Sequence, residues 1–299
     1  MNVLITGATG YFGHGFVKHL LDNNLAERIC IFSRGEFAQH TMRQKFNDDE
    51  RLRWFIGDVR DQDRLRRAMD GCDTVVHAAA LKRIEVAEYN ALECIATNVH
   101  GTENVVKAAI DAGVRVAVLL STDKACEPVT TYGLSKAMAE QIFHSAINYA
   151  PLHHITDPVR NFETEVWRTD FRVCRYGNVA GSTGSIIPTW RKLLETQDWV
   201  PVYDPTATRF WMHRDEAIEL VMQAIRKDAK QHDPIANTWI PTLKAYEVKD
   251  LALAMGARGR ITTPRGQEKK HEAMRAGDTS DMAKRMTVEQ LREALKNVE

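Results

Sequence analysis

Short apolar runs alternate with amphipathic stretches along the first part of the chain. The apolar runs lie at residues 3–5, 29–32, 54–58, 74–77, 114–120 and 171–175. Stretches with helical spacing separate most of them, including residues 97–112 and 135–149. A strand that is apolar on both sides is typical of a parallel sheet with helices on both faces. The pattern therefore predicts an α/β fold with a Rossmann-type, doubly wound parallel sheet.

The pattern loosens after about residue 180, where prolines, tryptophans and loop residues become more frequent. We expect a Rossmann domain over residues 1–178. Residues 179–299 would form mainly a smaller C-terminal substrate lobe, partly interleaved with the core. Residues 151–168 and 258–285 show little periodicity, and we expect both to be solvated loops, the first as a surface insertion.

Composition narrows the class of protein further. The chain has 40 Lys plus Arg and 40 Asp plus Glu, so its zero net charge argues against a nucleic-acid partner. Its five cysteines are scattered without metal-ligand spacing, which predicts reduced thiols and no metal site. No apolar run reaches the roughly eighteen residues of a membrane span. The first strand begins too early for a signal peptide, so we expect a cytoplasmic protein.

A glycine-rich turn joins the first strand to the helix after it. Glycines at this point allow a tight turn and let the backbone approach a pyrophosphate, which the free N–H groups of the helix N-terminus then bind. The turn therefore predicts a dinucleotide site. Its candidate cofactor contacts are Thr6, Gly7, Thr9, Gly10, Tyr11, Phe12 and Gly13.

The end of the second strand indicates which dinucleotide binds. The residues there are Ser33 and Arg34, whereas an NAD site usually places an acidic residue at this point. A hydroxyl and a guanidinium suit the 2′-phosphate of NADP, although the acidic Glu36 lies close by. Asp58 and Val59 follow the third strand and are candidates for contact with the adenine.

The most reactive groups follow the fifth strand. Ser121, Thr122, Asp123 and Lys124 are consecutive, and Tyr132 precedes Lys136 by four residues. This spacing puts the phenol and the amine on one face of a helix. Lys136 could then hold the cofactor ribose and lower the pKa of Tyr132, so that the phenol acts as a base toward a substrate hydroxyl.

At these residues the chain resembles the extended short-chain dehydrogenase/reductase family. More narrowly it is similar to soluble UDP-N-acetylglucosamine 4,6-dehydratases of the polysaccharide biosynthesis dehydratase family, which invert sugar carbon 5. The resemblance covers nearly the whole chain. It is carried by the stretches at residues 32–34, 77–82, 93–98, 121–125, 175–179, 208–211 and 286–291.

The resemblance implies a lyase with internal redox chemistry and a tightly bound NADP that is regenerated in each turnover. Tyr132 would take the proton from the 4-hydroxyl, Lys124 would remove the proton on carbon 5, and Asp123 would protonate the departing 6-hydroxyl. This requires a lowered pKa for Lys124 and a raised pKa for Asp123. The implied catalytic residues are Thr122, Asp123, Lys124, Tyr132 and Lys136.

Further positions follow from the same resemblance. Additional cofactor contacts are Ala78, Ala79, Ala80, Leu120, Ser121 and Val179, together with Tyr132 and Lys136. The implied substrate contacts are Lys82, Asn178, Arg209 and Glu268, with Arg209 meeting the UDP diphosphate. The partner would be a nucleotide sugar, UDP-N-acetylglucosamine or a close relative, and the family usually forms homo-oligomers.

Two residues narrow the resemblance further. Retaining relatives usually have methionine in place of Tyr132, so Tyr132 favours inversion at carbon 5. Hexose dehydratases acting on dTDP-glucose or GDP-mannose usually have an acidic residue in place of Lys124, so Lys124 points away from them. Two alternatives stay open. The chain could be a UDP-sugar 4- or 5-epimerase, or a catalytically idle NADP-binding regulator.

Overall fold

The computed structural model describes residues 1–157, 162–234, 238–263 and 268–298. Its main sheet has eight strands in the order β12-β13-β8-β5-β4-β1-β2-β3. Neighbouring strands are parallel except for the pair β12–β13. This order confirms the predicted doubly wound sheet. The strands are β1 (Asn2–Thr6), β2 (Arg28–Ser33), β3 (Leu52–Ile56), β4 (Thr74–His77), β5 (Val116–Thr122), β8 (Asp170–Tyr176), β12 (His232–Asp233) and β13 (Thr238–Trp239).

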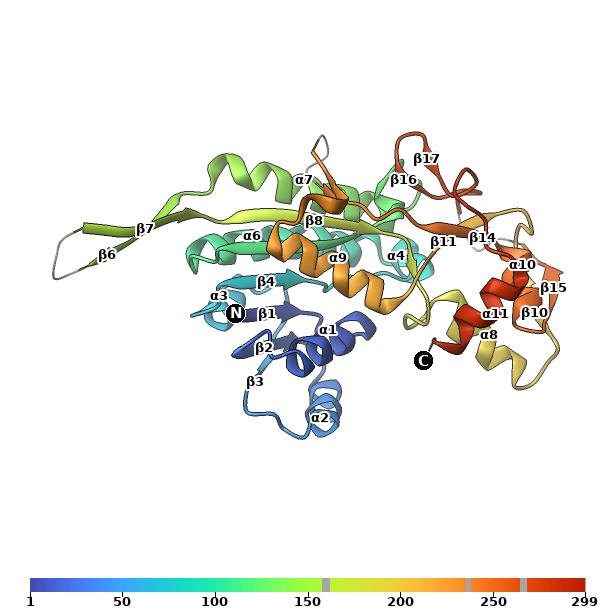
Figure 1. The fold of residues 1–299 in the computed structure, drawn as a ribbon, viewed down its shortest axis with the longest axis horizontal. Coiled ribbons are helices and arrows are strands. Elements are labelled where there is room, and N and C mark those ends of the chain that lie inside the picture. Colours follow the sequence, from blue (N-terminus) through green and yellow to red (C-terminus); the bar gives the residue numbers. More distant parts are fainter. Residues whose placement is uncertain (158–161, 235–237, 264–267, 299) are drawn as a thin grey trace.

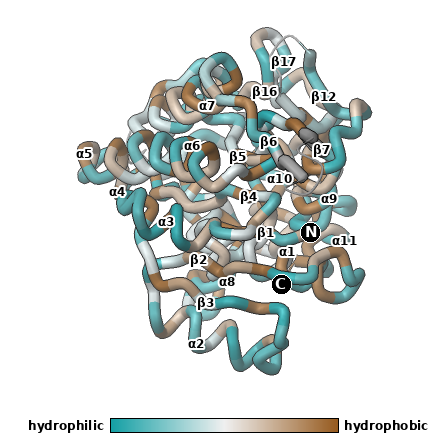
Figure 2. Tube along the Cα trace, turned by 90° about the vertical axis from the view of Figure 1, so that its left-hand side faces the viewer, coloured by the Kyte–Doolittle hydropathy of each residue, from teal (hydrophilic) through white to brown (hydrophobic). Residues whose placement is uncertain are grey.

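Helices cover both faces of this sheet, and Figure 2 shows the strands between the two layers. Side chains alternate across a strand, so Val3 and Ile5 of β1 enter one apolar cluster and Leu4 enters the other. This explains why the strand is apolar at consecutive positions. The first cluster includes α1 (Tyr11–Asp22), α2 (Glu36–Lys45) and α9 (Arg214–Arg226), and the second includes α3 (Gln62–Met69), α6 (Gly101–Asp111) and α7 (Thr131–Tyr149).

The C-terminal part of the chain forms a smaller lobe at one end of the sheet (Figure 1). It has its own apolar core, which includes Trp190, Trp211, Leu251 and Leu291. Its strands are β9 (Asn178–Val179), β10 (Trp199–Val202), β11 (Thr208–Met212), β14 (Lys244–Glu247) and β15 (Arg258–Ile261), and its helices are α8 (Ile186–Leu194), α10 (Val248–Ala254) and α11 (Val288–Lys296).

Three elements of the C-terminal part return to the main sheet. Helix α9 packs on α1, and β12 and β13 extend the sheet beyond β8. The expected division at residue 178, with a lobe partly interleaved with the core, stays a prediction.

The expected loop at residues 151–168 is wrong. Strands β6 (Leu152–Asp157) and β7 (Phe162–Arg168) form an antiparallel hairpin that projects from the body of the protein (Figure 1). The Trp167 indole donates to the carbonyl of Gly113 at 3.0 Å and lies under the Arg115 guanidinium. A projecting two-stranded ribbon has no face buried in the core, so its sequence lacks the usual apolar alternation. Residues 158–161 lie outside the described part.

The second expected loop, residues 258–285, is also partly wrong. It contains β15, β16 (Ala273–Arg275) and β17 (Asp278–Thr279), and Glu272, Met274 and Ser280 are buried. The Ser280 hydroxyl lies 2.6 Å from that of Thr208 and anchors the segment to β11. Polar residues of this segment are buried through such hydrogen bonds, so its sequence lacks a periodic pattern of apolar residues. Residues 264–267 lie outside the described part.

Other helical segments connect these elements. They are α4 (Ile84–Tyr89), α5 (Ala91–Ile95), a π-helical turn (Ala96–His100) and the 3₁₀ turns Asp123–Ala125 and Ala229–Gln231. All five cysteines are buried and unpaired. Within the described ranges, no helix combines the length and apolar character needed to cross a bilayer, and no cluster of side chains is suited to a metal ion.

Candidate active site

A large cavity lies at the carboxyl ends of the parallel strands, where doubly wound sheets bind ligands. Its volume is about 1160 Å³, and both the main sheet and the C-terminal lobe contribute to its wall. Every site residue expected from the sequence lines this cavity except Thr6 and Asp123. Those two are fully buried and contact residues of the wall.

The glycine-rich turn shapes one end of the cavity. Gly7 has φ +67°, and a Cβ atom there would lie 2.8 Å from the backbone of Ala79, so glycine alone fits both conditions. The Thr6 hydroxyl accepts from the backbone N–H of Ala79 at 3.2 Å and lies 2.7 Å from Nδ1 of His77. Thr6 therefore fastens the turn to the segment after β4 and is not itself in the wall.

Two observations show that this end fits a dinucleotide. Gly10 precedes α1 and offers no side-chain cap, so the first N–H groups of the helix are open to a phosphate. The Ser121 Oγ is buried without a hydrogen-bond partner among the described residues, although Ser121 lines the cavity. Leu120, Val179 and the Ala78–Ala80 stretch complete the same part of the wall.

The residues expected to select the cofactor lie together at the end of β2. The Gln39 amide donates to the Ser33 hydroxyl at 3.1 Å and orients it. Arg34 is 58% exposed, and its Nη1 lies 3.8 Å from Oδ2 of Asp58. Arg60 binds the same carboxylate at 2.7 Å. The Arg34 guanidinium is therefore held at the cavity rim and still accessible to a ligand.

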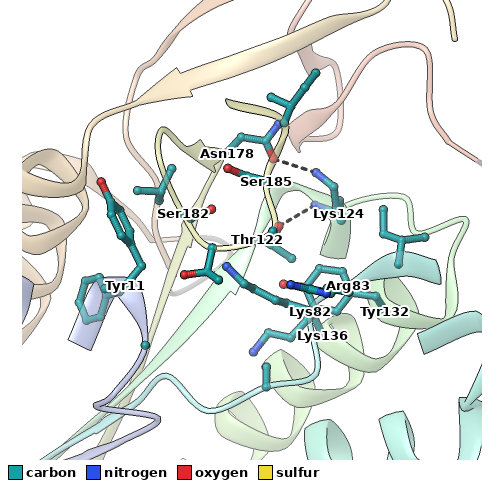
Figure 3. Close-up of a pocket in the computed structure, with 18 of the residues that line it drawn as sticks. Tyr11, Lys82, Arg83, Thr122, Lys124, Tyr132, Lys136, Asn178, Ser182 and Ser185 are labelled. Atoms are coloured by element: carbon teal, nitrogen blue, oxygen red, sulfur yellow. Dashed lines mark hydrogen bonds between the residues drawn. The ribbon is translucent and has the colours of Figure 1, made fainter. Parts of the chain in front are cut away.

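The start of α7 brings the phenol and the amines together. The Thr130 hydroxyl caps the helix by accepting from the N–H of Gly133 at 3.1 Å. A Cβ atom on Gly133 would clash with the carbonyl oxygen of Lys124. The missing side chain lets the helix begin against the Lys124 turn, and Tyr132, Lys136 and Lys124 consequently share one part of the wall (Figure 3).

The electrostatics of α7 differ in part from expectation. Burial raises the pKa of Tyr132 to about 12, although Lys124 and a hydrogen bond with Thr122 act in the lowering direction. The net pKa of Tyr132 is therefore raised and not lowered as expected, because burial outweighs the lowering by the nearby Lys124. Burial also lowers the pKa of Lys136 to about 8.

Asp123 and Lys124 form a tight polar cluster at the end of β5. Lys124 Nζ donates to Asp123 Oδ1 at 3.1 Å and to Asn178 Oδ1 at 3.2 Å, and the Thr122 hydroxyl donates to Asp123 Oδ1 at 2.9 Å. Figure 3 shows the contact between Lys124 and Asn178. Burial raises the pKa of Asp123, as its expected role as a proton donor requires.

A second charged partner of Lys124, Glu272, was not expected from the sequence. Its Oε1 lies 3.0 Å from Lys124 Nζ, and its side chain is almost fully buried. Burial alone would lower the pKa of the Lys124 amine, but the carboxylates of Asp123 and Glu272 outweigh it and raise that pKa. The expected lowering of the Lys124 pKa is therefore also wrong in direction.

The expected substrate contacts line the other end of the cavity. Arg209 Nη2 lies 3.2 Å from Glu268 Oε2, and Arg209 Nη1 donates to the carbonyl of Lys270 at 3.1 Å. Lys82 projects into the cavity beside Arg83 (Figure 3). Lys269, the neighbour of Glu268, also lines the wall, as does Arg83, which was not expected. Isolated charged residues such as these carry no spacing signal in the sequence.

The chain matches the family described as polysaccharide biosynthesis protein over residues 3–292. The UDP-N-acetylglucosamine 4,6-dehydratase (inverting) of Campylobacter jejuni subsp. jejuni serotype O:2 is 40% identical over 284 residues, covering 94% of this chain and 79% of the relative. A UDP-glucose 4-epimerase of Rickettsia prowazekii is 34% identical over 291 residues, covering 94% and 79%.

Among solved structures, Pen from Bacillus thuringiensis superposes with a TM-score of 0.86 at 28% identity. The superposition covers 99% of this chain and 98% of that one. The family match spans almost the whole chain and thus includes both the main sheet and the lobe. The chain therefore belongs to the polysaccharide biosynthesis protein family, as the resemblance in its sequence had indicated.

Proposed function

We propose that the protein is an NADP-dependent UDP-N-acetylglucosamine 4,6-dehydratase that inverts sugar carbon 5. The product would be a UDP-2-acetamido-2,6-dideoxy-4-keto-L-hexose. The observation that carries the proposal is the pairing of Asp123 with Lys124 at 3.1 Å, in contact with the cavity that also holds Tyr132 and Lys136. An oxidoreductase without elimination has no need of this second acid and base. The 40% identity to an enzyme named for this reaction supports the same conclusion.

The bound dinucleotide would accept hydride from sugar carbon 4 and return it to carbon 6. Gly7, Gly10 and the α1 N-terminus would hold its pyrophosphate. The Ser121 hydroxyl, which has no hydrogen-bond partner among the described residues, would form a hydrogen bond with the cofactor. Because the hydride taken from the sugar is given back to the sugar, the reaction needs no external oxidant or reductant.

Tyr132 would begin the reaction as the base toward the 4-hydroxyl. Burial raises its pKa, so the phenolate must be stabilised by the cations around it. Lys124 is the cation that lowers this pKa in the site, and Lys136 lies on the same face of α7. The Thr122 hydroxyl orients the phenol through its hydrogen bond.

Lys124 and Asp123 would then carry out the elimination. The 4-ketone acidifies the hydrogen on carbon 5, and Lys124 would take that proton once its ammonium, whose pKa the neighbouring carboxylates raise, has lost its own proton. Asp123, whose pKa is raised by burial, would hold a proton and give it to the departing 6-hydroxyl. Return of a proton to carbon 5 from the opposite face would complete the inversion.

Incubation with UDP-N-acetylglucosamine distinguishes this function from its alternatives. A dehydratase will release product lighter by one water, detectable by mass spectrometry. A product of unchanged mass but altered stereochemistry would favour a 4- or 5-epimerase, the activity named for the Rickettsia relative. No change in the sugar would favour an idle NADP-binding regulator.

The cofactor preference has a separate test in Arg34. We expect NADP to bind more tightly than NAD, since the Arg34 guanidinium is held at the rim of the cavity and can bind a 2′-phosphate. Arg34→Ala should reduce the preference for NADP over NAD by about tenfold or more, measured from the two dissociation constants. Arg60→Ala is the matched control, because Arg60 pairs with the same Asp58. An unchanged preference in Arg34→Ala would contradict this assignment.

We also expect a homo-oligomer in the cytoplasm. Apolar side chains that are strongly exposed on α4, α5 and α7 support self-association through the helices of the main domain, since such a patch is normally covered in solution. They include Tyr89, Leu92, Leu134 and Met138.

A further inference from the structure

Glu272 is a buried carboxylate surrounded by cations. It is only 3% exposed. Its Oε1 lies 3.0 Å from Lys124 Nζ and 3.9 Å from Arg209 Nε, and its Oε2 lies 3.9 Å from Lys269 Nζ. The residue lines the cavity, so its charge acts directly on the site. Burial of a charge carries a desolvation cost that ionic partners offset only in part.

The segment that carries Glu272 is fixed at several points. The backbone N–H of Glu272 donates to the Ser280 hydroxyl at 3.0 Å, and that hydroxyl donates to the carbonyl of Thr208 at 3.1 Å. Arg175 Nη1 donates to the carbonyl of Met274 at 2.7 Å, while Arg175 Nε donates to Glu140 of α7 at 3.0 Å. The Glu272 carboxylate is therefore held in register with the helix that carries Tyr132.

The two carboxylates that contact Lys124 have pKa values shifted in opposite directions. Burial raises the pKa of Asp123, and the charge of Glu272 raises it further. For Glu272, burial acts in the raising direction, but Lys124 and Arg209 outweigh it and lower the pKa. The arrangement therefore keeps the charge on Glu272 and favours a proton on Asp123, so that the carboxylates can serve different steps.

We propose that Glu272 is a positioning residue that aims Lys124 at sugar carbon 5 and stabilises the ammonium formed when Lys124 accepts the carbon-5 proton. This inference rests on the proposed dehydratase function. The proton moves from carbon 5 to Lys124 Nζ, and the electrons of the C–H bond pass into the enolate of the 4-ketone. Positive charge then develops 3.0 Å from Glu272 Oε1, where a fixed anion lowers the barrier.

The pH dependence of the step should report this contact. Lys124 faces Asp123 on its own turn, Glu272 before β16, Arg209 on β11, Tyr132 on α7 and Tyr246 on β14. Lys124 accepts a proton only when it is neutral, so the rate should rise with pH toward its pKa. Removing the Glu272 charge should lower that pKa and move the rise to lower pH.

The test compares Glu272→Gln with the wild-type protein on UDP-N-acetylglucosamine. We expect the midpoint of the rise in kcat to fall by at least one pH unit and the rate at the alkaline plateau to fall at least tenfold. KM should change less than kcat. Glu272→Asp keeps the charge but shortens the side chain, and should give a plateau between those of the other two enzymes.

Glu268→Gln is the matched control, because Glu268 also pairs with Arg209 but has no contact with Lys124 among the described residues. It should leave the pH midpoint at the wild-type value, whatever its effect on KM. A midpoint that is the same in wild-type and Glu272→Gln enzymes would overturn the inference. If Glu272→Gln does not fold, a wild-type midpoint and plateau in Glu272→Asp would overturn it instead. Failure of the wild-type protein to release water would overturn the proposed function and is a distinct result.

Discussion

A Lys124→Ala protein will bind UDP-N-acetylglucosamine but release product at least about 10²- to 10⁴-fold more slowly than wild type. The reason is that Lys124 is the amine in contact with Asp123, Glu272 and Asn178 at the cavity wall, where the carbon-5 proton would be removed. Because Tyr132 is retained, the 4-keto sugar should still form, although more slowly, since Lys124 no longer lowers the pKa of the phenol. Trapping with a hydroxylamine reagent and mass spectrometry should detect it bound to the protein.

Two comparisons make this result specific to Lys124. Lys107→Ala removes an exposed lysine of α6, paired with Glu103, and should leave the rate at the wild-type value. A small primary amine added to Lys124→Ala should restore part of the rate, since the cavity has room for it. A Lys124→Ala protein that releases product at the wild-type rate would exclude Lys124 as the base.

The second large effect is expected for Tyr132→Phe. Loss of the phenol should stop the reaction before the 4-ketone forms and reduce the rate by about 10²- to 10⁴-fold. No 4-keto sugar should then be trapped, in contrast to Lys124→Ala. This difference assigns the two residues to successive steps, and the trapping experiment measures it directly.

Tyr149→Phe provides the matched control. Tyr149 lies at the other end of α7 and is 58% exposed, so the loss of its hydroxyl should not change the rate. Trapped 4-keto sugar in Tyr132→Phe would show that another group takes the 4-hydroxyl proton.

Six of the eight strands in the main sheet could be predicted from the sequence, because each contains a short apolar run. In β1, for example, Val3 and Ile5 face one helix layer and Leu4 faces the other. The two-residue strands β12 and β13 contain no such run and were not predicted. The cofactor turn and the Tyr132–Lys136 pair were also visible, since their function depends on local spacing. The cavity that they line confirms that the fold brings these segments together.

The missed features depend on contacts between distant segments. Glu272 meets Lys124 from 148 positions along the chain, and hydrogen bonds of Ser280 to Glu272 and to Thr208 of β11 hold it there. The pKa of Lys124 could not be predicted for the same reason, because its direction is set by Glu272 as well as by Asp123. The β6–β7 hairpin escaped detection because a projecting ribbon has no core-facing apolar pattern.

The most direct test of the account follows carbon 5 of the sugar in deuterated water. The wild-type protein, incubated with UDP-N-acetylglucosamine, should give a product that has lost one water, carries one solvent deuteron at carbon 5 and has inverted configuration there. Nuclear magnetic resonance and mass spectrometry of the product measure all three properties. A dehydrated product without deuterium at carbon 5 would contradict the role of Lys124, and a product with retained configuration would contradict the proposed stereochemistry.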